Sequence, residues 1–486
     1  MASNSASVLQ SDILHSISRI QQARTNASAS QHVGVQQNQW QRPITEFGDC
    51  PDWSIWITKS AYVGNIDFDR AEWAESRQAV DEVMKWILED IRLQAKNYKG
   101  LRIDSYVRQG SSREGLKVYK ADEFDSMLEF HIEGLENRIK QTPIYKNGKI
   151  IPAFCYITIS DLSIDRLQRL CPELSYAGLF EYRDGHIFLS SKVIHEKVFE
   201  SMVDKAINTL SNTIREAKPW RHMAESFTLT RKMNPPAINV TIEMKFHGRP
   251  SKVIDLDLVP AYLFDYDRTT TYEGVLLNCP IHAICKWVDG EDLNQNLIWS
   301  SKSTGYEMHI FDVARNDPRK RKLFILTAVR IIKTYFVKTK EIAKAAGHPP
   351  PQITTVLKSY HLRQIAFYAM YYLCHRHPTL RLDCASAALS YVIGFLEKAL
   401  KAKRLPHFFY SSRLAQDMLP GYPEHYDRHL RFNLFRKISI EALERALQSL
   451  GENLIPNLGF SFGEIDDERK MVFSEFEGSL STGDYF

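Results

Sequence analysis

Residues 108–130 read RQGSSREGLKVYKADEFDSMLEF, and this stretch decides the fold. Glu123 and Asp125 stand two positions apart in a segment with strand-like alternation, so their carboxylates project from one face while Phe124 points to the other. Two neighbouring carboxylates on a half-buried sheet repel each other and lose hydration, a cost that a hard divalent cation offsets by taking both as oxygen ligands. The stretch therefore predicts a magnesium or manganese site on a strand.

A third carboxylate and a small-residue turn extend this prediction. Asp255 and Asp257 share a face of the alternating segment VIDLDLVPAY, and either can complete a two-metal site. The turn Gly110-Ser111-Ser112 lets backbone N–H groups and a hydroxyl approach a triphosphate closely. Taken singly, an acidic pair is usually a solvated strand face and a Gly-Ser turn is merely a turn. Together they indicate a site that holds a nucleoside triphosphate and activates a hydroxyl.

The order of the patterns along the chain indicates an α/β (α+β) protein of two lobes. Residues 1–50 are rich in Ser, Gln, Asn and Ala and are expected to be a disordered leader. A long amphipathic helix from about Asp69 to Gly100 and several alternating strands predict a mixed-sheet catalytic lobe over 51–270. Apolar helical periodicity after about residue 275 predicts a helical lobe over 271–455, followed by a polar acidic tail over 456–486.

Composition excludes several classes of protein. The chain has 486 residues, 44% hydrophobic content and a formal net charge of +4, which is typical of a folded protein and too small by itself to indicate a polyanionic partner. We expect no membrane partner, because no run of about 18 uncharged apolar residues occurs, and the amino terminus lacks a secretory signal pattern. The seven cysteines contain no close C-x-x-C pair, which favours reduced thiols and a cytoplasmic protein.

Several motifs in order resemble one known family. The segment GSSREGLKVYKADEFDSML is similar to the signature of the cGAS-like nucleotidyltransferases, the family of cGAS and the cGAS-like receptors, and the resemblance continues over roughly residues 60–410. It includes PAINVTI, DLVPAY, the region of Trp299, SYHLRQIAFYAMYYLC and FLEKALKAKRLPHFF. The resemblance implies a two-lobed polymerase-beta-like nucleotidyltransferase fold. It also implies that Glu123, Asp125 and Asp257 are the catalytic acids and bind two Mg²⁺ or Mn²⁺ ions, which selects Asp257 over Asp255.

The same resemblance implies the nucleotide-binding residues. Gly110, Ser111, Lys333 and Ser359 would contact phosphates, Tyr360 would stack on a nucleobase, and Glu307 would lie near the nucleotides. Without the resemblance, Lys333 reads as part of a basic helix face and Tyr360 as a tyrosine packed between helices.

Two positions depart from the family pattern. Trp299 is followed by Ser300, Ser301 and Lys302, where the family often has an arginine that reads a base. No zinc is expected, because the segment after His309, IFDVARNDPRKRK, lacks the cysteines of a zinc-binding insertion.

Two groups of cations are candidates for a nucleic-acid surface. Asp317 and Pro318 look like the cap and first residue of a helix, and four cations follow at once: Arg319, Lys320, Arg321 and Lys322. Cations at a helix start oppose the helix dipole, which favours binding of an external polyanion over the alternative of a solubilising run. The long first helix adds Lys85, Arg92, Lys96 and Lys99. Without a zinc insertion to engage DNA, double-stranded RNA is the favoured ligand and double-stranded DNA stays open.

These expectations combine into a hypothesis about function. The chain is expected to sense double-stranded nucleic acid and to make a cyclic dinucleotide of the cyclic GMP-AMP type, from ATP and GTP or other nucleoside triphosphates, in innate immune signalling. Whether it acts as a homodimer on its ligand is left open. The alternatives are a catalytically quiet nucleic-acid-binding or developmental protein of the same fold, and a linear polymerase or tRNA-tailing enzyme.

Overall fold

The structure is a computed structural model that describes Ile66 and residues 70–118, 120, 122–217, 224–234, 237–286, 294–410, 413–423, 429–458 and 466–486. The leader expected over 1–50 lies outside these residues.

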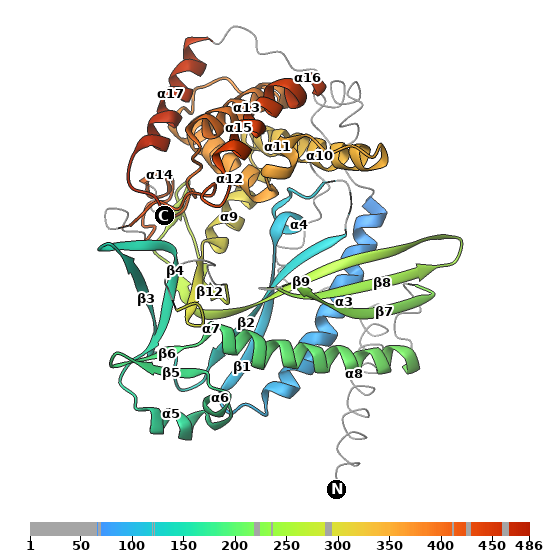
Figure 1. The fold of residues 1–486 in the computed structure, drawn as a ribbon, viewed down its shortest axis with the longest axis vertical. Coiled ribbons are helices and arrows are strands. Elements are labelled where there is room, and N and C mark those ends of the chain that lie inside the picture. The colour runs from blue at the N-terminus through green and yellow to red at the C-terminus, as the bar shows by residue number, and fades with distance from the viewer. Residues whose placement is uncertain are drawn as a thin grey trace, which may run out of the picture.

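The first half of the described chain is built on one mixed sheet with a long helix packed against it (Figure 1). Helix α3 spans Arg70–Ala95, and Gly100, whose φ is +88°, turns the chain into the first strand. The strands of the large sheet are β1 (Leu101–Gln109), β2 (Glu123–Ile132), β3 (Ile139–Lys146), β4 (Lys149–Ile159), β5 (Phe180–Arg183), β6 (His186–Leu189), β7 (Ser226–Asn234), β8 (Ala237–Phe246), β9 (Arg249–Asp267), β12 (Cys279–Ile284) and β13 (Ile298–Lys302). A turn at Asn147-Gly148, a residue pair that favours hairpins, joins β3 to β4, and both residues have a positive φ.

Strand β9 is the centre of this sheet. It pairs in parallel with β2 and antiparallel with β8 and β12, and the main path runs β1-β2-β9-β12-β13-β4-β6-β5. Helix α3 and helix α8 (Ser201–Ala217) pack on this sheet around one hydrophobic core, which includes Val83, Ile87, Phe130, Leu256 and Trp299. The alternation of β2 explains this burial, because Phe124, Leu128 and Phe130 enter the core while the carboxylates face the other way.

Helices form a second hydrophobic core in the other half. They are α9 (Thr304–Arg315), α10 (Arg321–Ala345), α11 (Gln352–Val356), α12 (Ser359–Met370) with the π-helical turn η4 (Tyr371–Arg376), α13 (Ala385–Ala402), α14 (Arg413–Met418), α15 (Ile440–Ser449) and α17 (Asp467–Ser481). The remaining elements are small: α4 (Gly110–Glu114), α5 (Ile164–Leu170), α6 (Pro172–Tyr176), α7 (Ser191–Val193), η3 (Ile194–Glu200), η6 (Leu450–Leu454), α16 (Ile455–Asn457), and the hairpin of β10 (Thr271–Tyr272) and β11 (Val275–Leu276). None of the described helices is long and apolar enough to cross a bilayer.

Two segments correct the expected organisation. Strands β12 and β13 lie inside the range predicted to be helical, 271–455, yet they complete the large sheet; they are too short to show much alternation in sequence. The segment 456–486 is not simply a polar tail, because α17 buries Val472, Phe473 and Phe476 against the helical core while its charged residues face outward.

Candidate active site

Three carboxylates converge where β2 and β9 run side by side. The parallel register places Asp125 opposite Asp257 and Glu123 opposite Asp255. Glu123, Asp125 and Asp257 each offer an oxygen, and these atoms all lie within 4.8 Å of one another. Asp255 is held apart by other partners, since its carboxylate accepts bonds from Lys232 at 2.9 Å and from Thr241 at 2.7 Å. The structure thus separates the two candidates for the third acid and brings Asp257 to the pair.

The three carboxylates lie close together and two of them are partly buried, so their negative charges are unfavourable in the folded protein. Burial, and then the charges of Glu123, Asp257 and Glu114, raise the pKa of Asp125 to about 7. Burial also raises the pKa of Asp257, although the side-chain amide of Asn239 donates to it at 2.7 Å and opposes the rise. All three donors are hard oxygens without a cysteine or histidine among them, so the residues fit Mg²⁺ or Mn²⁺.

The Gly110-Ser111 turn lies directly against these acids. It joins β1 to the short helix α4, and Gly110 has a φ of +70°. A Cβ atom at position 110 would overlap the carboxylate of Asp125, so the turn can approach this closely only with glycine. The carbonyl of Ser111 accepts backbone bonds from Leu116 at 2.9 Å and from Lys117 at 2.8 Å, which fixes the loop that returns to β2.

A cleft of about 600 Å³ opens between the sheet and the helical core at this point. Its wall includes five of the predicted nucleotide-binding residues, namely Gly110, Ser111, Lys333, Ser359 and Tyr360, together with Glu123 and Asp125. Lys333 comes from α10, where burial and the charge of Lys117 lower its pKa to about 8. Tyr360 is the second residue of α12 and is 38% exposed at the cleft wall, so it is not a core tyrosine.

The predicted residue Glu307 lies behind the cleft wall and not on it. Its carboxylate accepts a bond from the Ser303 hydroxyl at 2.6 Å and lies 3.4 Å from the guanidinium of Arg363. Glu307 is 3% exposed and is absent from the lining residues. Glu307 therefore contacts a residue of the cleft wall, Arg363, but does not itself reach the cleft.

Sequence reasoning missed several charged residues of the cleft: Glu114, Lys117, Lys286, Lys302 and Arg363. Lys117 is 7% exposed, and its ammonium lies 3.1 Å from Asp122 and 3.2 Å from Glu123. Burial, and then the nearby charge of Lys286, lower the pKa of Lys302 to about 7. A signal for Arg363 existed, because it lies one helical turn after Ser359 and Tyr360; Glu114 and the lysines become visible only when distant elements meet.

The four cations at 319–322 do not form one surface. Helix α10 begins at Arg321 and not at Pro318, because Lys320 takes a left-handed conformation with a φ of 58°. Arg319 and Lys320 are exposed. Arg321 donates to the carbonyls of Leu373, His377, Pro378 and Leu380, and Lys322 is buried in an ion pair with Glu273. The predicted group therefore divides into an outer pair and an inner pair.

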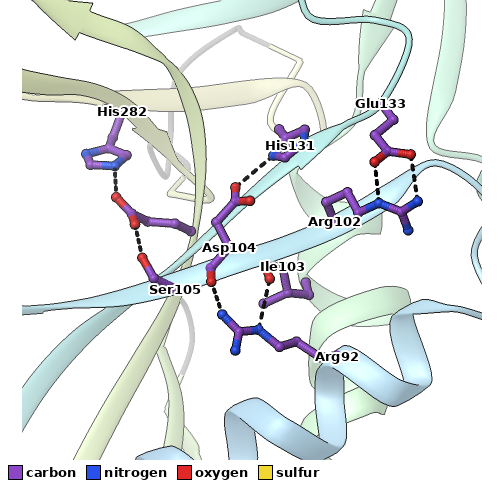
Figure 2. A network of polar contacts seen from close by, with 9 residues as sticks. Arg92, Arg102, Ile103, Asp104, Ser105, His131, Glu133 and His282 are labelled. Atoms are coloured by element: carbon purple, nitrogen blue, oxygen red, sulfur yellow. Dashed lines mark hydrogen bonds and ion pairs between the residues drawn. The ribbon is translucent and has the colours of Figure 1, made fainter.

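The predicted cations of α3, Lys85 and Arg92, and those of the segment directly after it, Lys96 and Lys99, also differ among themselves. Lys96 and Lys99 are exposed and Lys85 is half-buried, while the Arg92 guanidinium donates to the carbonyls of Ile103 and Asp104 (Figure 2). Arg92 thus ties the helix to β1.

The strand of the acids also carries a buried polar link. Nε2 of His282 on β12 lies 2.8 Å from Oε1 of Glu129 on β2, and the Ser105 hydroxyl donates to the same carboxylate (Figure 2). Burial alone would raise the pKa of Glu129, but these bonds lower it below its usual value. Since β9 lies between β2 and β12, this link crosses the strand of Asp257 on the same face as the acids, four residues along β2 from Asp125.

Comparison with known proteins gives a limited result. No family model matches the chain. The chain is 24% identical over 217 residues to a protein described as "Cyclic GMP-AMP synthase-like receptor" from Tribolium castaneum, a match that covers 40% of this chain and 46% of that protein. The match thus covers less than half of either protein. The chain is similar to a cGAS-like receptor over that part, and its acidic group is compatible with the nucleotidyltransferase chemistry that this similarity suggests.

Proposed function

We propose that this chain is a metal-dependent nucleotidyltransferase of the cGAS-like type that makes a cyclic dinucleotide when it binds double-stranded nucleic acid. One observation carries the proposal: Glu123, Asp125 and Asp257 converge beside the Gly110-Ser111 turn, and the first two line a cleft whose wall also presents Lys333, Ser359 and Tyr360. A triphosphate needs cations and small residues, a nucleobase needs an aromatic face, and the divalent ions between them need carboxylates. The likeness to the Tribolium protein supports the same assignment.

The proposed roles follow from position in the cleft. Gly110, Ser111, Lys333 and Ser359 would bind the triphosphate, and Tyr360 would stack on the base. Two bound Mg²⁺ or Mn²⁺ ions, held by Glu123, Asp125 and Asp257, would lower the pKa of the attacking ribose hydroxyl and stabilise the pyrophosphate leaving group. The hydroxyl oxygen would form a bond to the α-phosphorus as the α–β phosphoanhydride bond breaks, and Asp257 would lie beside the attacking hydroxyl. A second such step would close the ring.

The remaining parts of the proposal concern architecture and ligand. We propose a two-lobed polymerase-beta-like fold in which the sheet core and the helical core are the two lobes. We also propose duplex RNA as the favoured activator over duplex DNA, ATP and GTP as substrates, and a role in innate immune signalling. Arg319, Lys320, Lys85 and Lys96 are the cations best placed for the activator, since Arg321, Lys322 and Arg92 contact the protein itself.

A single product assay tests the proposal. Purified protein is incubated with four labelled ribonucleoside triphosphates and Mg²⁺ or Mn²⁺, with duplex RNA, duplex DNA or neither. We expect a phosphatase-resistant dinucleotide that forms only with a duplex. Long or linear products would indicate a polymerase or tailing enzyme, and the absence of any product under all conditions would indicate a catalytically quiet protein.

A further inference from the structure

One guanidinium bridges the sheet half and the helical half at the cleft. Nη1 of Arg363 donates to Oε1 of Glu114 at 2.6 Å, and Nη2 lies 3.4 Å from Oε2 of Glu307. Both carboxylates are almost fully buried, with 3% and 4% of the side chain exposed, whereas Arg363 retains 24%. A buried carboxylate is stable only with a partner, so these contacts constrain the three elements α4, α9 and α12.

The ion pair between Glu114 and Arg363 connects the two segments that form the ends of the cleft. Glu114 ends the short helix that starts at the Gly110-Ser111 turn, and Arg363 lies one turn after Ser359 and Tyr360 on α12. Both residues line the cleft. The pair therefore joins the elements proposed to bind the triphosphate and the base, although they are far apart in the sequence.

The geometry of a guanidinium paired with carboxylates keeps the distance between the segments that carry these groups fixed. A guanidinium is planar and holds its donors in a rigid fork, so two carboxylates that accept from it define its orientation. Glu114 also interacts electrostatically with Lys333, the other cation of the phosphate end. One buried carboxylate thus pairs with Arg363 and adds negative charge near Lys333.

We propose that Glu114 and Arg363 are positioning residues, whose ion pair sets the distance between the Gly110-Ser111 turn and the Ser359-Tyr360 end of α12. This inference rests on the proposed function, because it concerns the binding of a nucleoside triphosphate in the same cleft. The pair lets one nucleotide contact both ends at once.

The chain offers a matched control next to this pair. Arg113 donates to both carboxylate oxygens of Asp312 on α9, at 3.0 Å each, and so also joins α4 to the helical half. Neither Arg113 nor Asp312 lines the cleft. Loss of this second pair removes a similar bridge without changing the cleft wall.

The test compares the binding of a nucleotide and its nucleoside. The affinities of a non-hydrolysable ATP analogue with Mn²⁺ and of adenosine are measured for the wild type, Glu114→Gln, Arg363→Lys and Asp312→Asn, together with the melting temperature of each. In Glu114→Gln we expect the ratio of triphosphate to nucleoside affinity to fall about tenfold, a change of about 1.4 kcal/mol. Arg363→Lys keeps the charge but not the fork, so we expect a smaller fall. Asp312→Asn should lower the melting temperature and leave the ratio unchanged.

The outcomes separate this inference from the proposed function. An unchanged ratio in Glu114→Gln, or an equal fall in Asp312→Asn, would show that the pair only stabilises the fold. If Glu114→Gln does not fold, Arg363→Lys decides by the same criterion. If the wild type binds neither compound, the proposed function itself fails and the inference fails with it.

Discussion

Like charges gather in two regions of this molecule, with opposite results. On β2 and β9 the carboxylates of Glu123, Asp125 and Asp257 face one another across the parallel register. At the start of α10 the cations of Arg319–Lys322 diverge, because the chain turns at Lys320 and successive helical residues point about 100° apart. Strands hold alternate residues on one side, whereas a helix start distributes them.

The difference decides what each region can bind. Burial, and then the repulsion among the acids, raise the pKa of Asp125, and both effects favour a bound cation. In the basic run the charges of Arg321 and Lys322 are satisfied within the protein, by carbonyl groups and by Glu273. Only the outer pair, Arg319 and Lys320, remains on the surface. A count of like charges along the sequence therefore overestimates the charge available for binding at a helix start more than it does on a strand.

The largest expected effect comes from neutralising the acids. Glu123→Gln together with Asp125→Asn should reduce nucleotide joining by at least about a thousandfold, because ions that stabilise several kcal/mol of transition-state charge lose their ligands. Calorimetric titration should show that Mn²⁺ binding is lost as well. Asp255→Asn is the control on the neighbouring strand, and it should keep both properties since Asp255 is bonded to Lys232 and Thr241. Normal Mn²⁺ affinity in the folded double variant would rule out this site.

A second prediction divides the basic run. Arg319→Glu with Lys320→Glu should weaken duplex RNA binding about tenfold or more and make its salt dependence shallower, at an unchanged melting temperature. Arg321→Met with Lys322→Met should instead lower the melting temperature, because partly buried carbonyl groups and Glu273 lose their partners. Fluorescence anisotropy at several salt concentrations and thermal melts measure the two effects. If both pairs weaken binding equally without loss of stability, the run acts as one surface after all.

The smallest expected effect is a pH-dependent change in the melting temperature. The fold raises the pKa of Asp125 to about 7, so its protonated form contributes stability that is present below about pH 4 and lost as the pH rises through 7. Asn at this position has no such loss. Without divalent metal, Asp125→Asn should therefore melt higher than the wild type by on the order of a few degrees at pH 8, and by less at pH 5. Added Mn²⁺ should stabilise the wild type alone. A difference that does not change between pH 5 and pH 8 would contradict the assigned cause.

Local patterns were enough to predict the sheet around the site. Alternation was enough to predict strands around Glu123 and Asp125 and in the segment VIDLDLVPAY, and the structure confirms a mixed α/β protein. The approach of Asp257 to the acid pair was implied by the family resemblance and agrees with the strand register. These features depend on neighbours in sequence or on one strand pairing.

Other features depend on contacts that sequence patterns do not record. Strands β12 and β13 form because a sheet edge is available to them, and α17 packs because its few apolar residues meet the helical core. Glu114 and Arg363 are separated in sequence by most strands of the large sheet, so their contact could be seen only in the tertiary structure. The start of α10 was wrong by a turn because a left-handed lysine was not expected before it.

The close contact of Gly110 with Asp125 limits which codon changes at position 110 the structure can accept. Any single-base change in a glycine codon that replaces the residue adds a Cβ atom, and at position 110 that atom overlaps the carboxylate of Asp125. While aspartate stays at position 125, every single-base replacement of this glycine therefore introduces the overlap. The two codons are therefore linked: a smaller side chain at 125 would remove the overlap, although any other residue at 110 would still have to adopt the left-handed φ of +70°.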